Sequence, residues 1–302
     1  MSVESGTMQA TSQEHLQIQR ATQRAERTVK IYRVLLWIVL LVGTIVFLTP
    51  LWVMIVMALK TPHEVAATDI WSWPQKPTTE NFSIVLNSPN APFLDFFKNT
   101  FVITVLSTAG CLVSASLVAY PFARLRFRGR DRLFILLLST MMLPGIVTQI
   151  PSYIIFTHLH WVDTILPLVV PAWFGGGAFN IFLLRQFFMG IPRELDEAAI
   201  LDGATHATIF WRVIMPNSGA ALATVGIFAF VYNWKDFMGP LIYLNSPEKQ
   251  TLEQGLRTFQ SLQQEKWELI MAGSVLVMIP LLVIFLLGQR YFVKGIVMSG
   301  IK

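Results

Sequence analysis

The feature that most constrains this 302-residue chain is a series of long apolar runs. A helix needs roughly 20 consecutive apolar residues to cross the hydrocarbon core of a bilayer. The stretches that meet this length are 34–58, 99–120, 133–156, 164–184, 217–236 and 269–289. A backbone in lipid must satisfy its own hydrogen bonds, so each run is expected to be helical. The sequence therefore predicts an all-α, polytopic membrane protein with six transmembrane helices.

The composition supports the same class of protein. Hydrophobic residues make up 54% of the chain and charged residues only 14%, whereas soluble domains average roughly 25% charged residues. Too few charged side chains are present to cover a water-facing surface, which excludes an ordinary soluble domain. The single cysteine, Cys111, lies in an apolar run and has no partner for an intrachain disulfide. We interpret it as a small buried side chain.

Lysine and arginine are distributed unevenly among the segments that link the six runs. One side of the membrane would receive the N-terminal segment to Arg33, the loops near 121–132 and 185–216, and the C-terminus. These segments carry 5, 5, 3 and 3 basic residues, which is 16 of the 23 in the chain. Because basic residues mark the cytoplasmic side, we expect both termini in the cytoplasm. The net charge of +5 is explained by this orientation, so nucleic acid is not an expected partner.

The first 30 residues differ from the rest of the chain. Residues 1–30 are polar with few large apolar groups, so we expect a mobile cytoplasmic tail that runs into a short amphipathic helix near Ala21–Arg33. Residues 31–302 are expected to form one transmembrane domain.

Two of the predicted outer loops, near 60–96 and 241–266, are long for mere connectors. Long ordered loops often bind a partner. The first loop contains Trp71 and Trp73, and tryptophans of this kind also anchor loops that lie on the membrane surface. Both interpretations stay open.

Motifs of an enzyme are missing from the sequence. It contains no GxxxxGK[ST] phosphate loop and no serine nucleophile framed by glycines. His63 and Glu64 begin like a zinc-protease motif, but Ala67 occupies the position of the second histidine. His158 and His160 have no carboxylate or cysteine nearby, so we interpret them as polar groups at the membrane interface rather than as metal ligands. We predict no catalytic residue, metal or cofactor in this chain.

The most informative segment is 191–216, IPRELDEAAILDGATHATIFWRVIMP. Pro192 suits a helix start, and the residues that follow place acidic groups where the helix dipole favours them: Glu194, Asp196 and Glu197. Gly203 can take the left-handed conformation that ends a helix. The segment therefore predicts a short helix, a turn and a second helix over Thr205–Met215. Capping alone would equally suit an ordinary connector between two spans.

The spacing within this segment resembles the EAA motif of ABC-importer permeases. It runs Glu197-Ala198-Ala199, then Asp202-Gly203-Ala204, then a hydrophobic stretch that ends at Pro216. From about Val34 to Lys302 the chain resembles the MalG-type inner-membrane permease subunit of carbohydrate-uptake ABC importers. The stretches that carry this likeness are MMLPGIVTQIPSYIIF at 141–156, WVDTILPLVVP at 161–171, FNIFLLRQFF at 179–188 and QRYFVKGIVMSGIK at the C-terminus.

The resemblance implies a type I ABC-importer permease fold in the inner (plasma) membrane of a bacterial cell, with a cytoplasmic coupling helix at about 193–203. It also implies a function, as part of the translocation pathway for a sugar or oligosaccharide. The implied partners are a second homologous permease, a dimer of cytoplasmic ATPases that bind ATP and Mg, an extracytoplasmic solute-binding protein, and membrane lipid. ATP hydrolysis would take place in the ATPase subunits.

The resemblance further assigns roles to the coupling residues Glu197, Ala198, Ala199, Asp202 and Gly203. Glu197 would pair with a basic residue of the ATPase, the two alanines would pack closely against it, and Gly203 would make the turn. The C-terminal tail, about Arg290–Lys302, would also contact the ATPase. The loop near 241–266 would reach towards the binding protein.

Polar residues at membrane depth suggest a solute path, because such groups are costly in lipid and usually functional. The candidates are Gln149, Asn180, Tyr232, Asn233, Trp234 and Asp236. Aromatic faces beside hydrogen-bonding groups suit sugar rings, although the same residues could join helices through interhelical hydrogen bonds. Family members commonly carry Trp-Asn-Asp/Glu-Phe at the end of the fifth span, so Lys235 stands where asparagine is frequent. Its role stays open.

Glycines interrupt the fourth apolar run. Gly175-Gly176-Gly177 follow Pro167 and Pro171 in that run, which predicts a bent or locally unwound helix.

Two further functions are compatible with the sequence. One is an ABC-importer permease for another solute, such as a polyol phosphate or an amino acid. The other is a non-transporting membrane scaffold whose acidic helix recruits a soluble partner.

Overall fold

The computed structural model describes residues 2–89, 91–263 and 266–299, and within this part the chain is helical without any strand. Its elements are α1 Ser2–Ala58, α2 Pro62–Ala67, α3 Glu80–Leu86, α4 Phe93–Arg124, α5 Arg130–Ser139, η1 Thr140–Met142, α6 Gly145–His158, α7 Leu166–Gly175, α8 Ala178–Gly190, α9 Glu194–Leu201, α10 His206–Ile209, η2 Phe210–Ile214, α11 Met215–Asn217, α12 Gly219–Trp234, α13 Met238–Tyr243, η3 Pro247–Lys249, α14 Leu252–Leu262 and α15 Trp267–Ser299. The short η2 is a π-helical turn.

The number of membrane spans agrees with the sequence, although two of the spans are bent. Four helical stretches are long and apolar enough to cross a bilayer: Val29–Ala58, Phe93–Arg124, Leu166–Gly190 and Trp267–Gln289. Two bent pairs pass the same test together, Arg130–Met142 with Gly145–His158 and His206–Asn217 with Gly219–Trp234. Counting each pair as one span gives up to six spans within the part of the chain that the structure describes.

The third apolar run, 133–156, is not the single helix that we predicted. The helices on either side of Leu143 and Pro144 meet at 96°. Proline disfavours the helical conformation of the residue before it, and Leu143 is extended, with φ −77° and ψ 119°. The hydrophobic run is long enough for one span, but the backbone at Pro144 divides it.

The break predicted in the fourth run is confirmed. α7 ends at Gly175, and Gly176 and Gly177 take positive φ values of 59° and 80° before α8 begins. A Cβ on Gly176 would lie 2.6 Å from the backbone nitrogen of Ala115 in α4. The glycine therefore provides both the left-handed backbone and the close approach of α4 to the broken helix.

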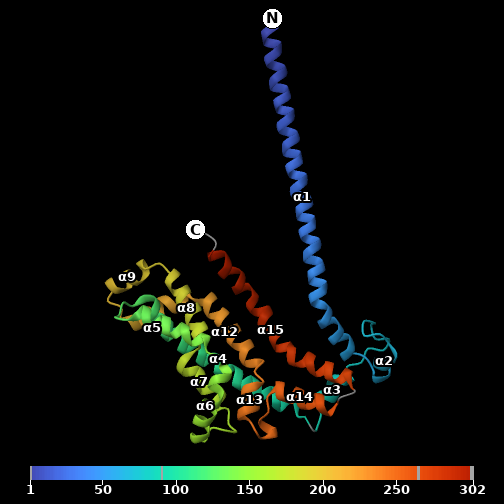
Figure 1. The fold of residues 1–302 in the computed structure, drawn as a ribbon, viewed down its shortest axis with the longest axis vertical. Coiled ribbons are helices and arrows are strands. Elements are labelled where there is room, and N and C mark those ends of the chain that lie inside the picture. Colours follow the sequence, from blue (N-terminus) through green and yellow to red (C-terminus); the bar gives the residue numbers. More distant parts are fainter. Residues whose placement is uncertain (1, 90, 264–265, 300–302) are drawn as a thin grey trace.

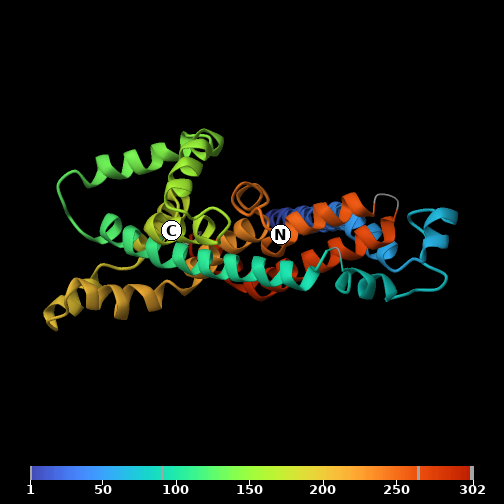
Figure 2. The same ribbon diagram turned by 90° about the horizontal axis from the view of Figure 1, so that it is seen from below.

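Helix α4 is the central helix of the bundle and runs along its length (Figure 2). It packs against α7, α8 and α12. Two hydrophobic cores lie along it. The first joins α4 to α8, α10 and α12 through residues such as Leu184, Ile214 and Val225, and the second joins its other end to α3, α14 and α15 around Val85 and Leu252.

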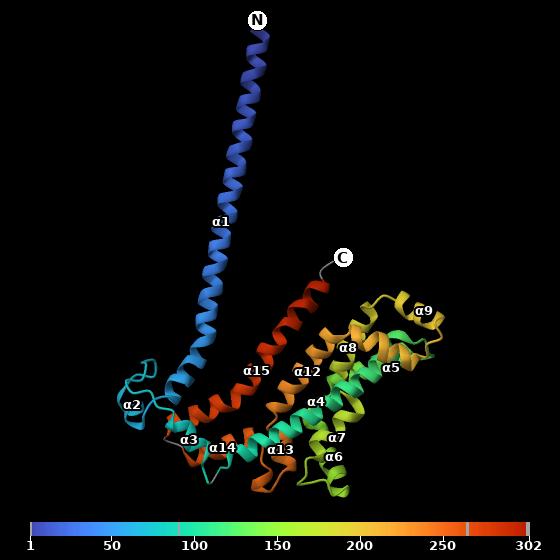
Figure 3. The same ribbon diagram turned by 180° about the vertical axis from the view of Figure 1, so that it is seen from behind.

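The two faces of the bundle carry different elements. Figures 1 and 3 show α9 and the far end of α15 on the side towards which α1 extends. The short helices α2, α3, α13 and α14 lie on the opposite side (Figure 1). The described side chains of α1 between Val29 and Leu48 are largely exposed.

The N-terminal helix begins earlier than expected. Its backbone is helical from Ser2, so it is longer than the short helix predicted near Ala21–Arg33. The side chains of residues 1–28 lie outside the described part, and the mobility of residues 1–30 stays a prediction.

Candidate functional site

The acidic segment 193–203 forms the helix that the sequence predicted. α9 has three acidic residues in its first turn, Glu194, Asp196 and Glu197, where they stabilise the positive end of the helix dipole. At the other end, the Gly203 N–H donates to the Ile200 carbonyl at 2.9 Å and the Ala204 N–H donates to the Ala199 carbonyl at 2.9 Å. This pair of bonds is a Schellman motif. It requires the positive φ of 80° that Gly203 adopts.

The turn leads directly into a second, firmly anchored helix. The Thr205 hydroxyl accepts a hydrogen bond from the Thr208 N–H and caps α10. Ile209 and Ile214 follow, with 1% and 0% of their surface exposed, in the core between α4 and α12. The start of the second helix is therefore fixed to the bundle on one side of α9.

An ion pair fixes α9 itself to the end of α4. Arg124 Nη1 lies 3.5 Å from Asp196 Oδ2, and the Arg124 side chain is only 2% exposed. Arg124 Nη2 also donates to the Ile191 carbonyl at 2.8 Å. Because one guanidinium holds both the helix and the segment before it, motion of α9 would be transmitted to α4.

Apart from Asp196, the acidic side chains of this segment form no ion pair with the described residues. Glu197, Ala198 and Asp202 are exposed. Apolar side chains accompany them: Ile200 is 53% and Leu201 is 89% exposed. A rigid helix that presents an acidic group, a small residue and exposed leucine to the surroundings is typical of a protein-binding surface.

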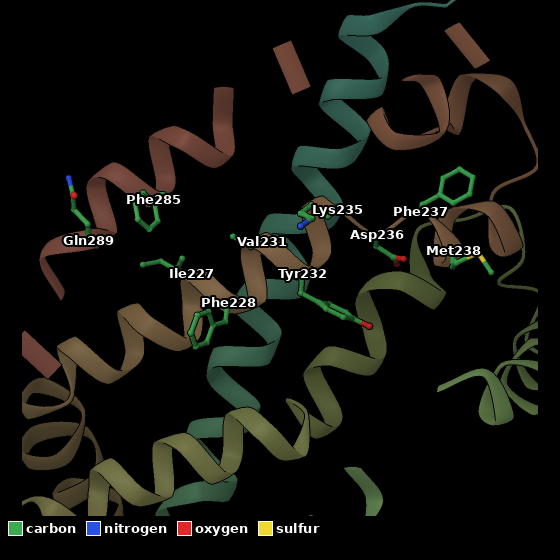
Figure 4. A pocket seen from close by; sticks show the side chains of 10 residues that line it. All are labelled: Ile227, Phe228, Val231, Tyr232, Lys235, Asp236, Phe237, Met238, Phe285 and Gln289. Carbon is green, nitrogen blue, oxygen red and sulfur yellow. The ribbon is translucent and has the colours of Figure 1, made fainter. Parts of the chain in front are cut away.

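A cavity of ≈ 1040 Å³ opens between α12 and α15 (Figure 4). Its lining is mostly apolar and aromatic, with Gln289 of α15 at one end and polar groups at the other: Tyr232, Lys235 and Asp236. Asp236 accepts a hydrogen bond from the Gly239 N–H at 3.1 Å, which fixes the direction of its carboxylate. An apolar cavity with a few placed polar groups is suited to binding a small solute.

The remaining solute-path candidates do not line this cavity. Trp234 is 1% exposed and donates from Nε1 to the Val277 carbonyl of α15 at 3.1 Å. Asn233 donates to the Ala229 carbonyl within its own helix at 2.7 Å. Asn180 donates to the Gly176 carbonyl at 2.8 Å and to Cys111 Sγ at 3.1 Å. It therefore provides a hydrogen bond to a backbone carbonyl at the break between α7 and α8. Gln149 is partly exposed on α6, away from the cavity lining.

Further charges stand near the polar end of the cavity. Burial raises the pKa of the Glu253 carboxyl, while the positive charges of Arg257 and Lys235 oppose that rise. Arg257 also lies 5.7 Å from the centre of the Phe237 ring. Helix α14 thus brings charges close to the polar residues of the cavity.

Sequence reasoning missed a polar cluster that joins the loop after α6 to the segment after α13. Asp163 has a positive φ of 61°, and its carboxylate accepts hydrogen bonds from Ser246 and from Lys249 Nζ at 2.8 Å. The Lys249 ammonium and the Ser246 hydroxyl hold the pKa of Asp163 well below its ordinary range. Asp163 occurs in the stretch WVDTILPLVVP, but no local pattern in the sequence points to partners more than 80 residues away.

The segment between α1 and α3 is also ordered by buried charged groups. Lys60 is 0% exposed and donates to Thr68, Ser72 and the Asp69 carbonyl. Glu64 is buried, which favours its neutral form, but the backbone N–H groups of Thr61, Lys76 and Gln75 donate to it and bring its pKa below the ordinary value. This loop is therefore a folded unit rather than a flexible connector.

Known proteins share both the membrane spans and the segment that forms α9. A family model described as the inner membrane component of binding-protein-dependent transport systems matches residues 112–298. The chain belongs to this family. The matched residues include α9, the broken helix α7–α8 and the cavity between α12 and α15.

Individual proteins show the same relationship. The permease protein UgpE of the sn-glycerol-3-phosphate transport system of Yersinia pestis is 32% identical, over 87% of this chain and 95% of its own. The permease protein AraQ of the arabinooligosaccharides transport system of Bacillus subtilis is 29% identical, over 90% of this chain and 96% of its own. Among solved structures, a bacterial ABC transporter involved in alginate import has a chain with a TM-score of 0.77 and 23% identity, covering 88% of this chain and 98% of that one. The fold is therefore that of an ABC-importer permease.

Proposed function

We propose that this chain is the permease subunit of an ATP-driven importer and forms part of the translocation pathway for a sugar or oligosaccharide. Family membership gives the transport role, and the similarity to a permease for arabinooligosaccharides supports the solute class. The cavity between α12 and α15 supports a solute path, because Tyr232 and Asp236 offer hydrogen bonds beside aromatic side chains. Sugars combine apolar C–H faces with hydroxyl edges, and both find counterparts there.

The observation that carries this proposal is the construction of α9. Its first turn is acidic, its end is closed by a Schellman motif, and Arg124 ties it to α4. Glu197, Ala198, Ala199, Asp202 and Gly203 would form the docking surface for a separate ATPase. ATP binding would close the ATPase dimer and favour one conformation of the bundle through this contact. A rigid helix transmits such a displacement, whereas a flexible loop would absorb it.

The complete importer would contain several other chains. They are a second, homologous permease, two ATPase subunits that hold ATP and Mg, and an extracytoplasmic solute-binding protein. The distribution of basic residues would put α9 and both termini in the cytoplasm. The C-terminal tail, about Arg290–Lys302, has no described side chains, and its contact with the ATPase is part of the same proposal.

Reversing the charge of Glu197 tests the docking role. We expect Glu197→Lys to leave the chain inserted in the membrane and to reduce solute uptake by about 10-fold or more, since a contact with a basic residue becomes repulsive. The matched control is Glu80→Lys, which reverses an exposed acid in the first turn of α3 on the opposite face. The assay is uptake and ATP hydrolysis by the reconstituted complex in proteoliposomes. Normal uptake by Glu197→Lys would show that α9 is not the docking helix.

A phosphate-bearing polyol is the second candidate solute. It is favoured by the similarity to UgpE and by Lys235, whose ammonium lies at the polar end of the cavity. Solute-stimulated ATP hydrolysis with neutral oligosaccharides and with polyol phosphates, each supplied with the cognate binding protein, separates the two. Stimulation by the phosphate ester alone would replace the sugar proposal.

A further inference from the structure

A second cavity, of ≈ 510 Å³, lies where the loop between α4 and α5 meets the start of α9. We call it the arginine pocket. Arginines make up most of its lining: Arg126, Arg130, Arg132 and Arg193. Phe127, Gly129 and Asp131 complete the lining. None of these residues belongs to the cavity between α12 and α15 or to the exposed face of α9.

Positive charge in the arginine pocket is not balanced by the protein. Asp131 accepts a hydrogen bond from Arg130 Nε at 2.9 Å, and Arg130 Nη1 donates to the Leu125 carbonyl at 3.4 Å. The other three arginines, Arg126, Arg132 and Arg193, form no side-chain hydrogen bond or ion pair with the described residues. Three exposed guanidinium groups around one cavity give it a positive potential that attracts an anion. Their planar donor pairs match the oxygens of a phosphate.

The helix that leaves the pocket is apolar and exposed. α5 begins at Arg130, and within two turns it exposes Leu133 by 50%, Ile135 by 66% and Leu136 by 63%. These side chains belong to a segment long and apolar enough to form half of a bent span, so their exposed apolar surface suits lipid acyl chains. Figure 2 shows α5 set apart from α4 on one side of the bundle. A ligand that occupied both surfaces would need a phosphate group joined to long apolar chains.

We propose that the arginine pocket binds the headgroup of an anionic phospholipid whose acyl chains lie along α5. Basic pockets at the cytoplasmic ends of transmembrane helices are suited to such headgroups. A soluble acidic protein would match the charges but would leave the apolar face of α5 unexplained. The uncapped start of α5, where Gly129 has a φ of 86° and no side chain caps the helix, adds a small positive potential on the same side. This proposal does not depend on which solute is transported.

The experiment is native mass spectrometry of the purified importer complex after equilibration with phosphatidylglycerol or with zwitterionic phosphatidylcholine. The wild-type complex is expected to retain phosphatidylglycerol preferentially. The double variant Arg126→Gln/Arg132→Gln should bind it on the order of 30-fold more weakly, since each arginine near a membrane surface contributes roughly a fivefold effect. The matched control, Arg128→Gln/Arg212→Gln, loses the same charge from exposed arginines that do not line the pocket. It should keep the wild-type preference.

A second measurement needs only the wild-type protein. A phosphatidylglycerol analogue with a photoreactive headgroup should crosslink to peptides that contain residues 126–132. Crosslinks confined to other segments would overturn the proposal, as would equal loss of lipid in the two double variants. Inorganic phosphate or glycerol 3-phosphate at millimolar concentration should not displace the lipid. Displacement at that concentration would assign the pocket to a soluble phosphate instead.

Discussion

The contact between Arg124 and Asp196 should control how firmly α9 is held to the bundle. The proposed perturbation is Asp196→Asn, which keeps the shape of the side chain and removes its charge. Arg124 would then remain buried, with the Ile191 carbonyl as its remaining hydrogen-bond acceptor among the described residues. The α9 segment should open more often without unfolding the rest of the chain.

The size of the effect follows from the geometry. At the 3.5 Å separation of Arg124 Nη1 and Asp196 Oδ2, two unit charges in a medium with an effective dielectric constant of about 20 attract each other by about 5 kcal/mol. The cost of removing both charges from water offsets part of this attraction. Asp196 is also 17% exposed, so we place the loss in Asp196→Asn at about 2–3 kcal/mol, below the roughly 3–5 kcal/mol measured for fully buried pairs. An opening equilibrium should therefore shift by about 30-fold to 150-fold.

Hydrogen exchange of the nucleotide-free complex measures this equilibrium directly. Backbone amides of residues 197–204 should lose protection by that factor in Asp196→Asn, while those of α12 should not change. The control is Glu194→Gln, which removes another acid from the same first turn but breaks no ion pair. It should change protection by less than about fivefold, the size of a dipole effect. Equal exchange in wild type and Asp196→Asn would refute the reasoning, because α9 would then be held by other contacts.

Three further predictions concern other parts of the fold. Gly176→Ala should destabilise the purified complex by about 2–4 kcal/mol in thermal unfolding, because the position has a positive φ and lies against α4. The control Gly175→Ala should have little effect, because nothing lies within 4 Å of its new Cβ. The pKa of Asp163 is lowered in the folded state. The ionised carboxylate therefore stabilises the fold at any pH above the pKa of an unfolded aspartate, and this stabilisation is lost only as the pH falls towards the lowered pKa of the folded state. Protection of the Ser246 amide, which donates to Asp163, should accordingly be constant between about pH 5 and 8, and Asp163→Asn should lower it throughout. Trp234→Phe should lower the free energy of unfolding by about 1 kcal/mol, because it removes the hydrogen bond to the Val277 carbonyl. It should leave the dependence of uptake on solute concentration unchanged. An altered dependence would assign Trp234 to the solute path.

The features that the sequence predicted correctly are those fixed by local chemistry. The helix 194–201 and its left-handed end depend on neighbouring residues, namely the acidic first turn and Gly203. The break at Gly176 and Gly177 is likewise set by residues that tolerate positive φ. Such features require no knowledge of the rest of the fold, so they could be predicted from a single chain.

The errors and omissions depend on interactions that are distant in sequence or on competing signals. The run 133–156 is long enough for a span, so the sequence predicted one helix there in spite of Pro144. In the structure the two helices that meet near Pro144 are bent by 96°. The ion pair between Arg124 and Asp196 joins residues on separate helices. Each residue also had a local explanation: Arg124 as a basic residue on the cytoplasmic side, and Asp196 as an acidic residue in the first turn of a helix. Only the packing of α4 against the acidic segment brings the two together.

Some of the candidate solute-path residues line the cavity, whereas others form hydrogen bonds within the fold. Tyr232 lies in the last turn of α12, Asp236 follows two residues after that helix ends at Trp234, and both line the cavity. Asn233 and Asn180 instead satisfy backbone carbonyls, in α12 and at the break before α8. In a lipid-exposed protein an unsatisfied carbonyl is costly, so an asparagine near a helix break or a helix end meets that need before it is available to a solute. Contact with the cavity therefore distinguishes candidate pathway residues from structural ones better than polarity does.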